Sequence, residues 1–340
     1  MFSLTFLTGQ RQGKRTLPEV TPAMEEMTTA PSNVTQVEVF NVTNGPRLTV
    51  PRKDIILGLS FTCLLIAFCG LLGNSIVIWF LGFRIPKNKF TVYILNLAIA
   101  DFLFLMTVWA FLVYILYTKF IYQIPNEQNK IIHKFMWILN ETGFNAGIYL
   151  LMAVSIERCL CALYPFWFRC RRPKYQSTIV CILLWALSFL VVGLEQFICK
   201  GVEYPKPGSE PCTTVYFVTS TLFVAVVLFM ILSSLILIVT IQKISVQCQP
   251  SRFYIAIIAS VVIFLISVVP ERLLGLLIYF QLVPSYSFMY YFFYVIFLSS
   301  SFNCAANPFI YFLVGSLRRW KFSGSFSEAL QRVFNDETET

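Results

Sequence analysis

Charged residues and histidine are scarce in this chain of 340 residues. Asp, Glu, Lys and Arg together make up 13% of it, and His133 is the only histidine. A soluble domain of this length needs a far more polar surface. The sequence shows no cluster of metal ligands and no nucleophile beside a base, so it argues against an enzyme and against a metal site. We therefore expect no cofactor.

Hydrophobic residues, in contrast, make up 57% of the chain, and the mean hydropathy is +0.71. They gather in seven windows, each long enough to cross a hydrocarbon layer of about 30 Å at about 20 residues per span. The windows are 55–83, 90–117, 131–163, 178–199, 213–241, 253–280 and 286–314. We predict an all-α membrane protein with a seven-transmembrane helix bundle. The net charge of +9 does not indicate a nucleic-acid partner, because the cations stand at the ends of the windows.

The cations are distributed unevenly over the connecting segments. One set of loops and the segment after the seventh window carry twelve lysines and arginines, and the opposite loops with their adjoining helix ends carry five. Positive loops stay inside the cell, so the N-terminus is expected outside and the C-terminus in the cytoplasm. Glycosylation sequons at Asn33 and Asn41 favour the same orientation.

This layout divides the chain into three parts. Residues 1–53 are rich in Thr, Pro and Glu and lack helical periodicity, which predicts a disordered, glycosylated extracellular tail. Residues 54–315 form the transmembrane domain. Residues 316–340 begin with apolar side chains that can share one helix face opposite cations, which predicts a short amphipathic helix on the inner leaflet, followed by a short cytoplasmic tail.

Several polar residues interrupt the apolar windows. Asn74 lies in the first, Asp101 in the second, and Asn307 in the seventh, followed by Pro308 and Tyr311. Polar side chains at mid-bilayer are costly unless they face one another inside the bundle. We expect Asn74, Asp101 and Asn307 to form a buried cluster. A purely structural hydrogen-bond cluster explains these residues almost as well as a functional one.

The third window ends in an acid and an arginine. It runs down to Glu157 and Arg158, breaks at Pro165, and is followed by a block of cations. Mutual pairing can hold Glu157 and Arg158 ionised and still let them open toward the cytoplasm. The alternative is two interfacial charges that extend to water.

The order of these features is specific. Asn74, Asp101, Arg158, Trp185 in the fourth window, Pro270 in the sixth and the motif 307–311 in the seventh resemble the rhodopsin-like G-protein-coupled receptors over about 51–334. Segments 90–94, 155–159, 172–176, 183–188, 301–308 and 312–316 resemble the Mas-related receptors in particular.

That resemblance implies a plasma-membrane receptor with a role in sensory signalling. It implies an extracellular ligand and a heterotrimeric G protein as partners, with arrestin, a receptor kinase and membrane lipid besides. By the same resemblance, Arg158 engages the G protein, and Asp101 with Asn307 forms the polar core that rearranges on activation.

The chain departs from the general receptor pattern at several positions. The third-window acid is Glu157 rather than Asp, Cys159 stands where Tyr is usual, and Val268 stands where many receptors have Trp. These three departures fit the Mas-related receptors. The fifth window has no proline, which is a departure even among them.

Only two of the ten cysteines are expected on the oxidising side of the membrane. Cys199 and Cys212 stand at the two ends of the loop between the fourth and fifth windows. No cysteine stands at the outer end of the third window, where the common receptor disulfide is anchored. We therefore predict a Cys199–Cys212 disulfide, with two free thiols as the alternative.

Three carboxylates are expected at one height in the outer half of the bundle. Glu141 lies 17 residues above Arg158, Glu195 lies 18 above Ser177, and Glu271 lies 19 above Arg252. At about 1.5 Å per residue these separations are about 25–28 Å. Arg272 is the cation available there. The alternative is that Glu271 pairs with Arg272 while Glu141 faces water.

The resemblance singles out Glu195 as the acid that meets cationic ligands in several Mas-related receptors. Those receptors carry a second acid near the start of the fifth helix, where this chain has Tyr216. We expect a cationic peptide or amine ligand, bound by Glu195 with Glu141, Glu271 and Arg272 nearby. The rival function, a transporter or channel, tends to show repeats in two matching halves. The sequence shows none, and it has an odd number of spans.

Overall fold

The computed structural model describes residues 53–84, 89–117, 130–173, 175–199, 210–244, 252–279 and 288–316. Within these ranges the chain is helical and has no strand. The elements are α1 (Lys53–Trp79), the π-helical turn η2 (Phe80–Arg84), α2 (Thr91–Leu116), α3 (Lys130–Leu163), α4 (Pro165–Cys170), α5 (Gln176–Ile198), α6 (Glu210–Ile244), α7 (Arg252–Tyr279) and α8 (Phe288–Ser316).

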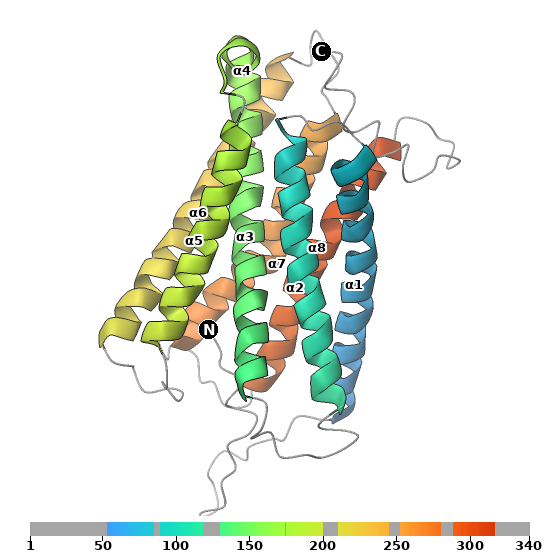
Figure 1. Cartoon of the computed structure of the whole chain (residues 1–340), viewed down its shortest axis with the longest axis vertical. Helices are drawn as coiled ribbons and strands as arrows, with labels where there is room; N and C mark the ends of the chain where they lie inside the picture. Colours follow the sequence, from blue (N-terminus) through green and yellow to red (C-terminus); the bar gives the residue numbers. More distant parts are fainter. Residues whose placement is uncertain are drawn as a thin grey trace, which may run out of the picture.

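Seven of these helices are long and apolar enough to cross a membrane, and they lie side by side in one bundle (Figure 1). Helices satisfy their own backbone hydrogen bonds, which is what a segment surrounded by lipid requires. The predicted bundle of seven spans is confirmed. The predicted window ends agree with the helix ends to within three residues when η2 is counted with α1.

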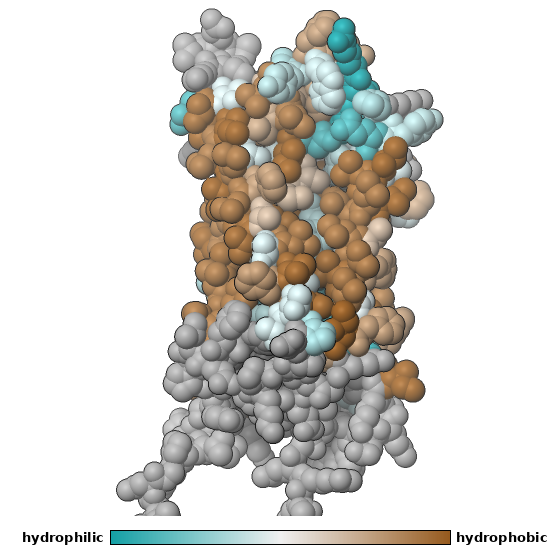
Figure 2. Space-filling view, turned by 90° about the vertical axis from the view of Figure 1, so that its left-hand side faces the viewer, coloured by the Kyte–Doolittle hydropathy of each residue, from teal (hydrophilic) through white to brown (hydrophobic). Residues whose placement is uncertain are grey.

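The bundle is apolar on its surface as well as in its core. Figure 2 shows a broad hydrophobic band around the middle of one face, with hydrophilic residues gathered near the top. Exposed side chains such as Leu65, Phe217 and Ile266 belong to three different helices. A helix that is apolar on its outer face suits a lipid environment.

Helix α3 is the central element of the bundle. It packs against α2, α5, α6 and α7, and it also contacts the short α4. Hydrogen bonds between helices fix its position. The Asn140 amide donates to the Thr107 hydroxyl on α2 at 2.9 Å, and the Ser188 hydroxyl on α5 donates to the Thr142 carbonyl at 2.7 Å. Residues on α3 are therefore held in a fixed relation to four other spans.

The first and last spans, α1 and α8, approach closely because two glycines of α1, Gly70 and Gly73, face α8. A Cβ added to Gly70 would lie 2.8 Å from the Cβ of Ala305, and one added to Gly73 would lie 2.9 Å from the Cβ of Pro308. Small residues at a helix interface allow backbones to approach in this way. This contact, which we call the α1–α8 seam, closes the ring of helices.

The short helix α4 was not foreseen as an element. Pro165 was expected only to break the third span, and the break does occur, at Tyr164, whose φ of −129° and ψ of 62° are not helical. Proline is also favoured in the first turn of a helix, where its missing N–H is not needed. Pro165 accordingly starts α4, which contacts α3.

Several predicted features lie outside the described residues. They are the extracellular tail with Asn33 and Asn41, and the amphipathic helix expected after Ser316.

Candidate functional site

The predicted polar core is present between α1, α2 and α8. Asp101 is buried, and its Oδ2 accepts a hydrogen bond of 2.8 Å from Nδ2 of Asn307. Asn74 donates to the carbonyls of Gly70 and Cys304, at 2.9 and 3.3 Å, so it joins the core through backbone rather than through Asp101. Pro308 and Tyr311 are buried beside Asn307 on the same helix. The sequence therefore located these residues, and the structure adds their partners.

At the end of the bundle where α3 terminates, which we call the Arg158 end, one carboxylate oxygen of Glu157 has two partners. Its Oε1 accepts a hydrogen bond of 2.9 Å from the Tyr93 hydroxyl and one of 2.8 Å from Nη2 of Arg172. The same Nη2 donates to the Ser177 hydroxyl at 2.8 Å, and Ser177 in turn donates to the Lys89 carbonyl at 2.7 Å. The Glu157–Arg172 ion pair and its hydrogen bonds thus connect α3 to α2, to α5 and to the segment after α4.

Glu157 also has a partner that was not expected. The ion pair that the structure shows for Glu157 is with Arg172, a residue the sequence placed only among the loop cations. The physical reason is α4, which turns the chain so that Arg172 lies next to Glu157. Sequence spacing alone could not show this, because it depends on the direction the chain takes after Pro165.

Arg158 lies against aromatic rings. Its Cζ is 3.3 Å from the centre of the Phe90 ring and 5.9 Å from that of Tyr254 on α7. The residue is 1% exposed. Phe90 also stacks on Phe168 of α4, with ring centres 4.9 Å apart and planes 12° apart. Nothing in the sequence beyond their apolar character indicated these aromatic partners.

The opposite end, which we call the Glu271 end, contains a small cleft of about 60 Å³. Six of its lining residues are polar or charged: Asn140, Glu141, Tyr216, Glu271, Arg272 and Ser300. Aromatic side chains make up much of the remaining wall: Phe104, Trp137, Phe144 and Phe297. A cleft with an apolar wall and a few convergent polar groups is the usual form of a small-ligand site.

The charges in this cleft have specific partners. Nη2 of Arg272 lies 3.8 Å from Oε2 of Glu141, and its Cζ lies 4.8 Å from the centre of the Phe144 ring. Oε2 of Glu271, which is buried, accepts hydrogen bonds from Ser299 at 2.7 Å and Ser300 at 3.0 Å. The alternative pairing, Glu271 with Arg272 and Glu141 facing water, is therefore wrong. The rotation of α7 directs the two neighbouring side chains to different partners.

Glu195 is half-buried near this cleft and is not among its lining residues. Arg272 interacts electrostatically with Glu141, Glu271 and Glu195. The three carboxylates expected in one layer are thus brought to one cation. The ion pairs shown for the described residues do not include Glu195.

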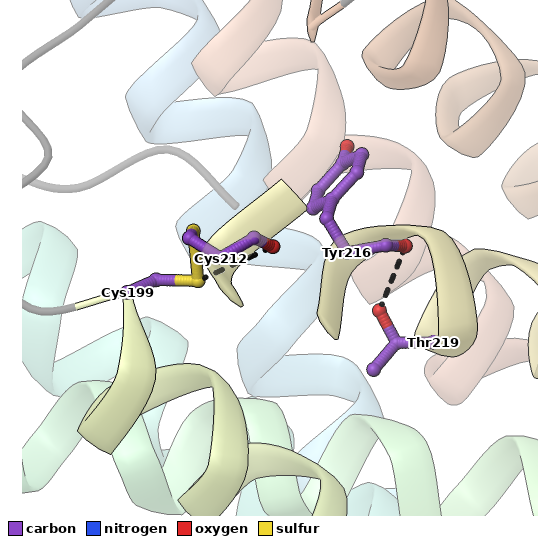
Figure 3. The surroundings of a disulfide bond; sticks show 4 residues. All are labelled: Cys199, Cys212, Tyr216 and Thr219. Carbon is purple, nitrogen blue, oxygen red and sulfur yellow. Dashed lines mark hydrogen bonds between the residues drawn. A yellow bond between two sulfur atoms is a disulfide. The ribbon is translucent and has the colours of Figure 1, made fainter. Parts of the chain in front are cut away.

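The predicted disulfide is present. Cys199 at the end of α5 and Cys212 near the start of α6 are joined, with Cα atoms 4.9 Å apart (Figure 3). Tyr216 and Thr219 follow on the next turns of α6, and the Thr219 hydroxyl donates to the Tyr216 carbonyl at 3.2 Å. The bond holds the start of α6 against α5 close to one wall of the cleft.

The described residues hold no group of three His, Cys, Asp or Glu side chains that could bind a metal ion. What the geometry offers is a cleft at one end of a membrane-spanning bundle, a buried polar core in the middle, and a buried arginine at the other end.

Comparison with known proteins assigns the class of this protein. Residues 73–311 match the family described as 7 transmembrane receptor (rhodopsin family), so the fold and the ordered polar residues belong to a receptor rather than an enzyme. The chain is 40% identical to the proto-oncogene Mas of Homo sapiens over 272 residues, which cover 79% of this chain and 80% of that protein.

Two further relatives are named as Mas-related receptors. Mas-related G-protein coupled receptor member D of Homo sapiens is 39% identical over 283 residues, covering 82% of this chain and 84% of that protein. Member H of Mus musculus is 40% identical over 275 residues, covering 81% and 82%. The chain belongs to the Mas and Mas-related family of G-protein-coupled receptors, and it is a multi-pass membrane protein.

Proposed function

We propose that this receptor binds a cationic peptide or amine at its Glu271 end and activates a heterotrimeric G protein through Arg158 at the other end. The observation that carries the ligand proposal is the balance of charge around the cleft. Three carboxylates, Glu141, Glu195 and Glu271, interact with one arginine, Arg272. A ligand that brings a further positive charge gains from pairing with these carboxyl groups.

Glu195 is the acid best suited to pair with the ligand. Arg272 already lies beside Glu141, and two serines already donate to Glu271. Glu195 is half-buried, has a side-chain hydrogen bond with Thr219, and has no ion pair among those shown for the described residues. A partly desolvated carboxylate gains most when a charged donor reaches it.

The orientation follows from the loop charges and belongs to the same proposal. The Glu271 end faces outside the cell, the Arg158 end faces the cytoplasm, and Asn33 and Asn41 carry glycans. An epitope at the C-terminus is then detected only in permeabilised cells, and its detection on intact cells would reverse the assignment. Arrestin, a receptor kinase, membrane lipid and a role in sensory signalling complete the proposal.

The ligand proposal is tested by calcium and cAMP readouts in cells that express the receptor and are challenged with a panel of basic peptides and amines. For the agonist found, Glu195→Gln lowers potency roughly 10- to 100-fold, since a hydrogen bond to a charged group contributes about 1.5–3 kcal/mol. Glu141→Gln has a smaller effect because Arg272 already neutralises that carboxylate.

The matched control is Asp54→Asn, which removes an exposed carboxylate at the first turn of α1. It leaves potency unchanged. An agonist that is neutral or anionic, indifferent to Glu195 and dependent on Arg272, would overturn the proposal.

The coupling proposal is tested with the same agonist. Arg158→Ala abolishes G-protein activation and leaves surface expression and agonist binding largely intact. Undiminished signalling in this variant would show that Arg158 is only an interfacial charge.

A further inference from the structure

Arg158 cannot reach a partner protein in the arrangement that the structure shows. The residue is 1% exposed, although the coupling proposed above requires it to be accessible from the cytoplasm. A buried guanidinium needs compensating contacts. The contacts that surround it therefore decide how readily it is released.

The neighbouring carboxylate also has other partners. Oε1 of Glu157 serves Arg172 and Tyr93, as described above. The nearest ring to Arg158 is Phe90, with its centre 3.3 Å from Cζ, well inside the distance of about 6 Å at which a cation and an aromatic face attract one another. The attraction is stronger where both groups are removed from water, and Phe90 is buried as well.

Phe90 is itself held in place by the short helix α4. It stacks on Phe168, and Cζ of Arg172 lies 4.4 Å from the centre of the Phe168 ring. Nζ of Lys89, the residue before Phe90, donates to the Phe168 carbonyl at 2.8 Å. The Phe90–Phe168 pair thus connects the two arginines, with Arg158 on Phe90 and Arg172 on Phe168.

We propose that Phe90 is a positioning residue that restrains Arg158 in the uncoupled receptor through the face of its ring. The restraint is an aromatic contact, in which the ring face of Phe90 meets the guanidinium of Arg158. This inference rests on the proposed coupling through Arg158. Weakening the contact raises the fraction of receptors in which Arg158 is released, and so raises signalling without agonist.

The test compares substitutions that keep or remove the ring. At equal surface expression, Phe90→Leu raises basal G-protein activation about 2- to 30-fold, the range that corresponds to a cation–π contact at partly to fully desolvated sites. Phe90→Tyr keeps an electron-rich face and stays near the unmodified level. Phe302→Leu, the same change on a half-exposed phenylalanine of α8, is the matched control and leaves basal activation unchanged.

A second series of variants separates the electrostatic attraction of the ring face from the packing of the ring. Phenylalanines with increasing numbers of fluorine atoms, incorporated at position 90, keep the ring and progressively weaken its negative face. Basal activation rises with each added fluorine. This series also decides the matter if Phe90→Leu fails to reach the surface. Basal activation that is indifferent to fluorination would overturn the proposal, because packing alone would then account for Phe90.

Failure of the proposed coupling gives a different result. Arg158→Ala alone tests the coupling. The double variant, Phe90→Leu with Arg158→Ala, shows no raised basal activation if the effect of Phe90 passes through Arg158. High basal activation in the double variant would show that Phe90 acts on something other than Arg158. Full signalling in Arg158→Ala alone would refute the coupling whatever Phe90 does.

Discussion

Each end of the bundle has an ion pair between an arginine and a glutamate, and the two pairs differ in length and in burial. At the Arg158 end, the Arg172–Glu157 ion pair is 2.8 Å long, and the two side chains are 0% and 7% exposed. At the Glu271 end, the Arg272–Glu141 ion pair is 3.8 Å long, and the side chains are 32% and 17% exposed. The first pair is buried and short, and the second is partly hydrated and long.

The difference shows what each pair can do. Breaking a buried pair by removing one partner leaves an uncompensated charge in the protein interior, so such a pair fixes one arrangement. A partly exposed pair contributes little, because water competes for both groups. The Arg158 end is therefore built to hold its charges in place. At the Glu271 end a charge can be exchanged at small cost, which is consistent with the proposed ligand site.

The largest expected effect comes from neutralising the acid of each pair in turn. Glu157→Gln leaves Arg172 buried without its counter-charge and is expected to cost about 3–5 kcal/mol of stability. Glu141→Gln is the matched change at the other end and is expected to cost about 0–1 kcal/mol. Thermal unfolding of the purified receptor measures both. Equal losses in the two variants would remove the contrast between the ends.

A smaller effect is expected from the covalent bond at the Glu271 end. Cys199 and Cys212 are 13 residues apart, and closing a loop of that size stabilises a fold by about 3 kcal/mol, often less in practice. Cys212→Ser should lower the melting temperature and the agonist potency, because the start of α6 is released near the cleft. Cys69→Ser, at an exposed cysteine of α1, is the control and should change neither.

The smallest effect is a difference in salt sensitivity. Raising ionic strength from about 0.1 to 1 M shortens the screening length from about 10 to 3 Å. Affinity of a cationic agonist, measured on receptor in detergent or nanodiscs, should fall severalfold over this range, because the Glu271 end is partly hydrated. The thermal stability difference between the unmodified receptor and Glu157→Gln should stay constant, because the Glu157–Arg172 pair is buried. A salt-dependent difference would show that water reaches Glu157.

Much of the fold was predictable because membrane spans are defined by length and apolarity alone. The seven spans, the Asp101–Asn307 contact and the disulfide followed from which residue types occur in which window and on which side. These features depend on position along a helix axis, and the rise per residue is nearly constant.

The parts that could not be predicted depend on the rotation of each helix about its own axis and on the direction that the chain takes where a helix ends. Residue counting placed Glu141, Glu195 and Glu271 at one height, yet it could not tell that Glu195 stands outside the lining of the cleft. The direction in which a side chain leaves its helix is set by packing. The partner of Glu157 was missed for a related reason, since Arg172 reaches it only because Pro165 starts a new helix.

The α1–α8 seam also bears on how the receptor is made. The surface of α1 at Gly70 and Gly73 is shaped to receive Ala305 and Pro308, which lie more than two hundred residues later in the chain. A ribosome delivers α1 to the membrane first and α8 last. The contact between the first and last spans therefore forms only after α8 has entered the membrane, and the α1–α8 seam is completed late in assembly.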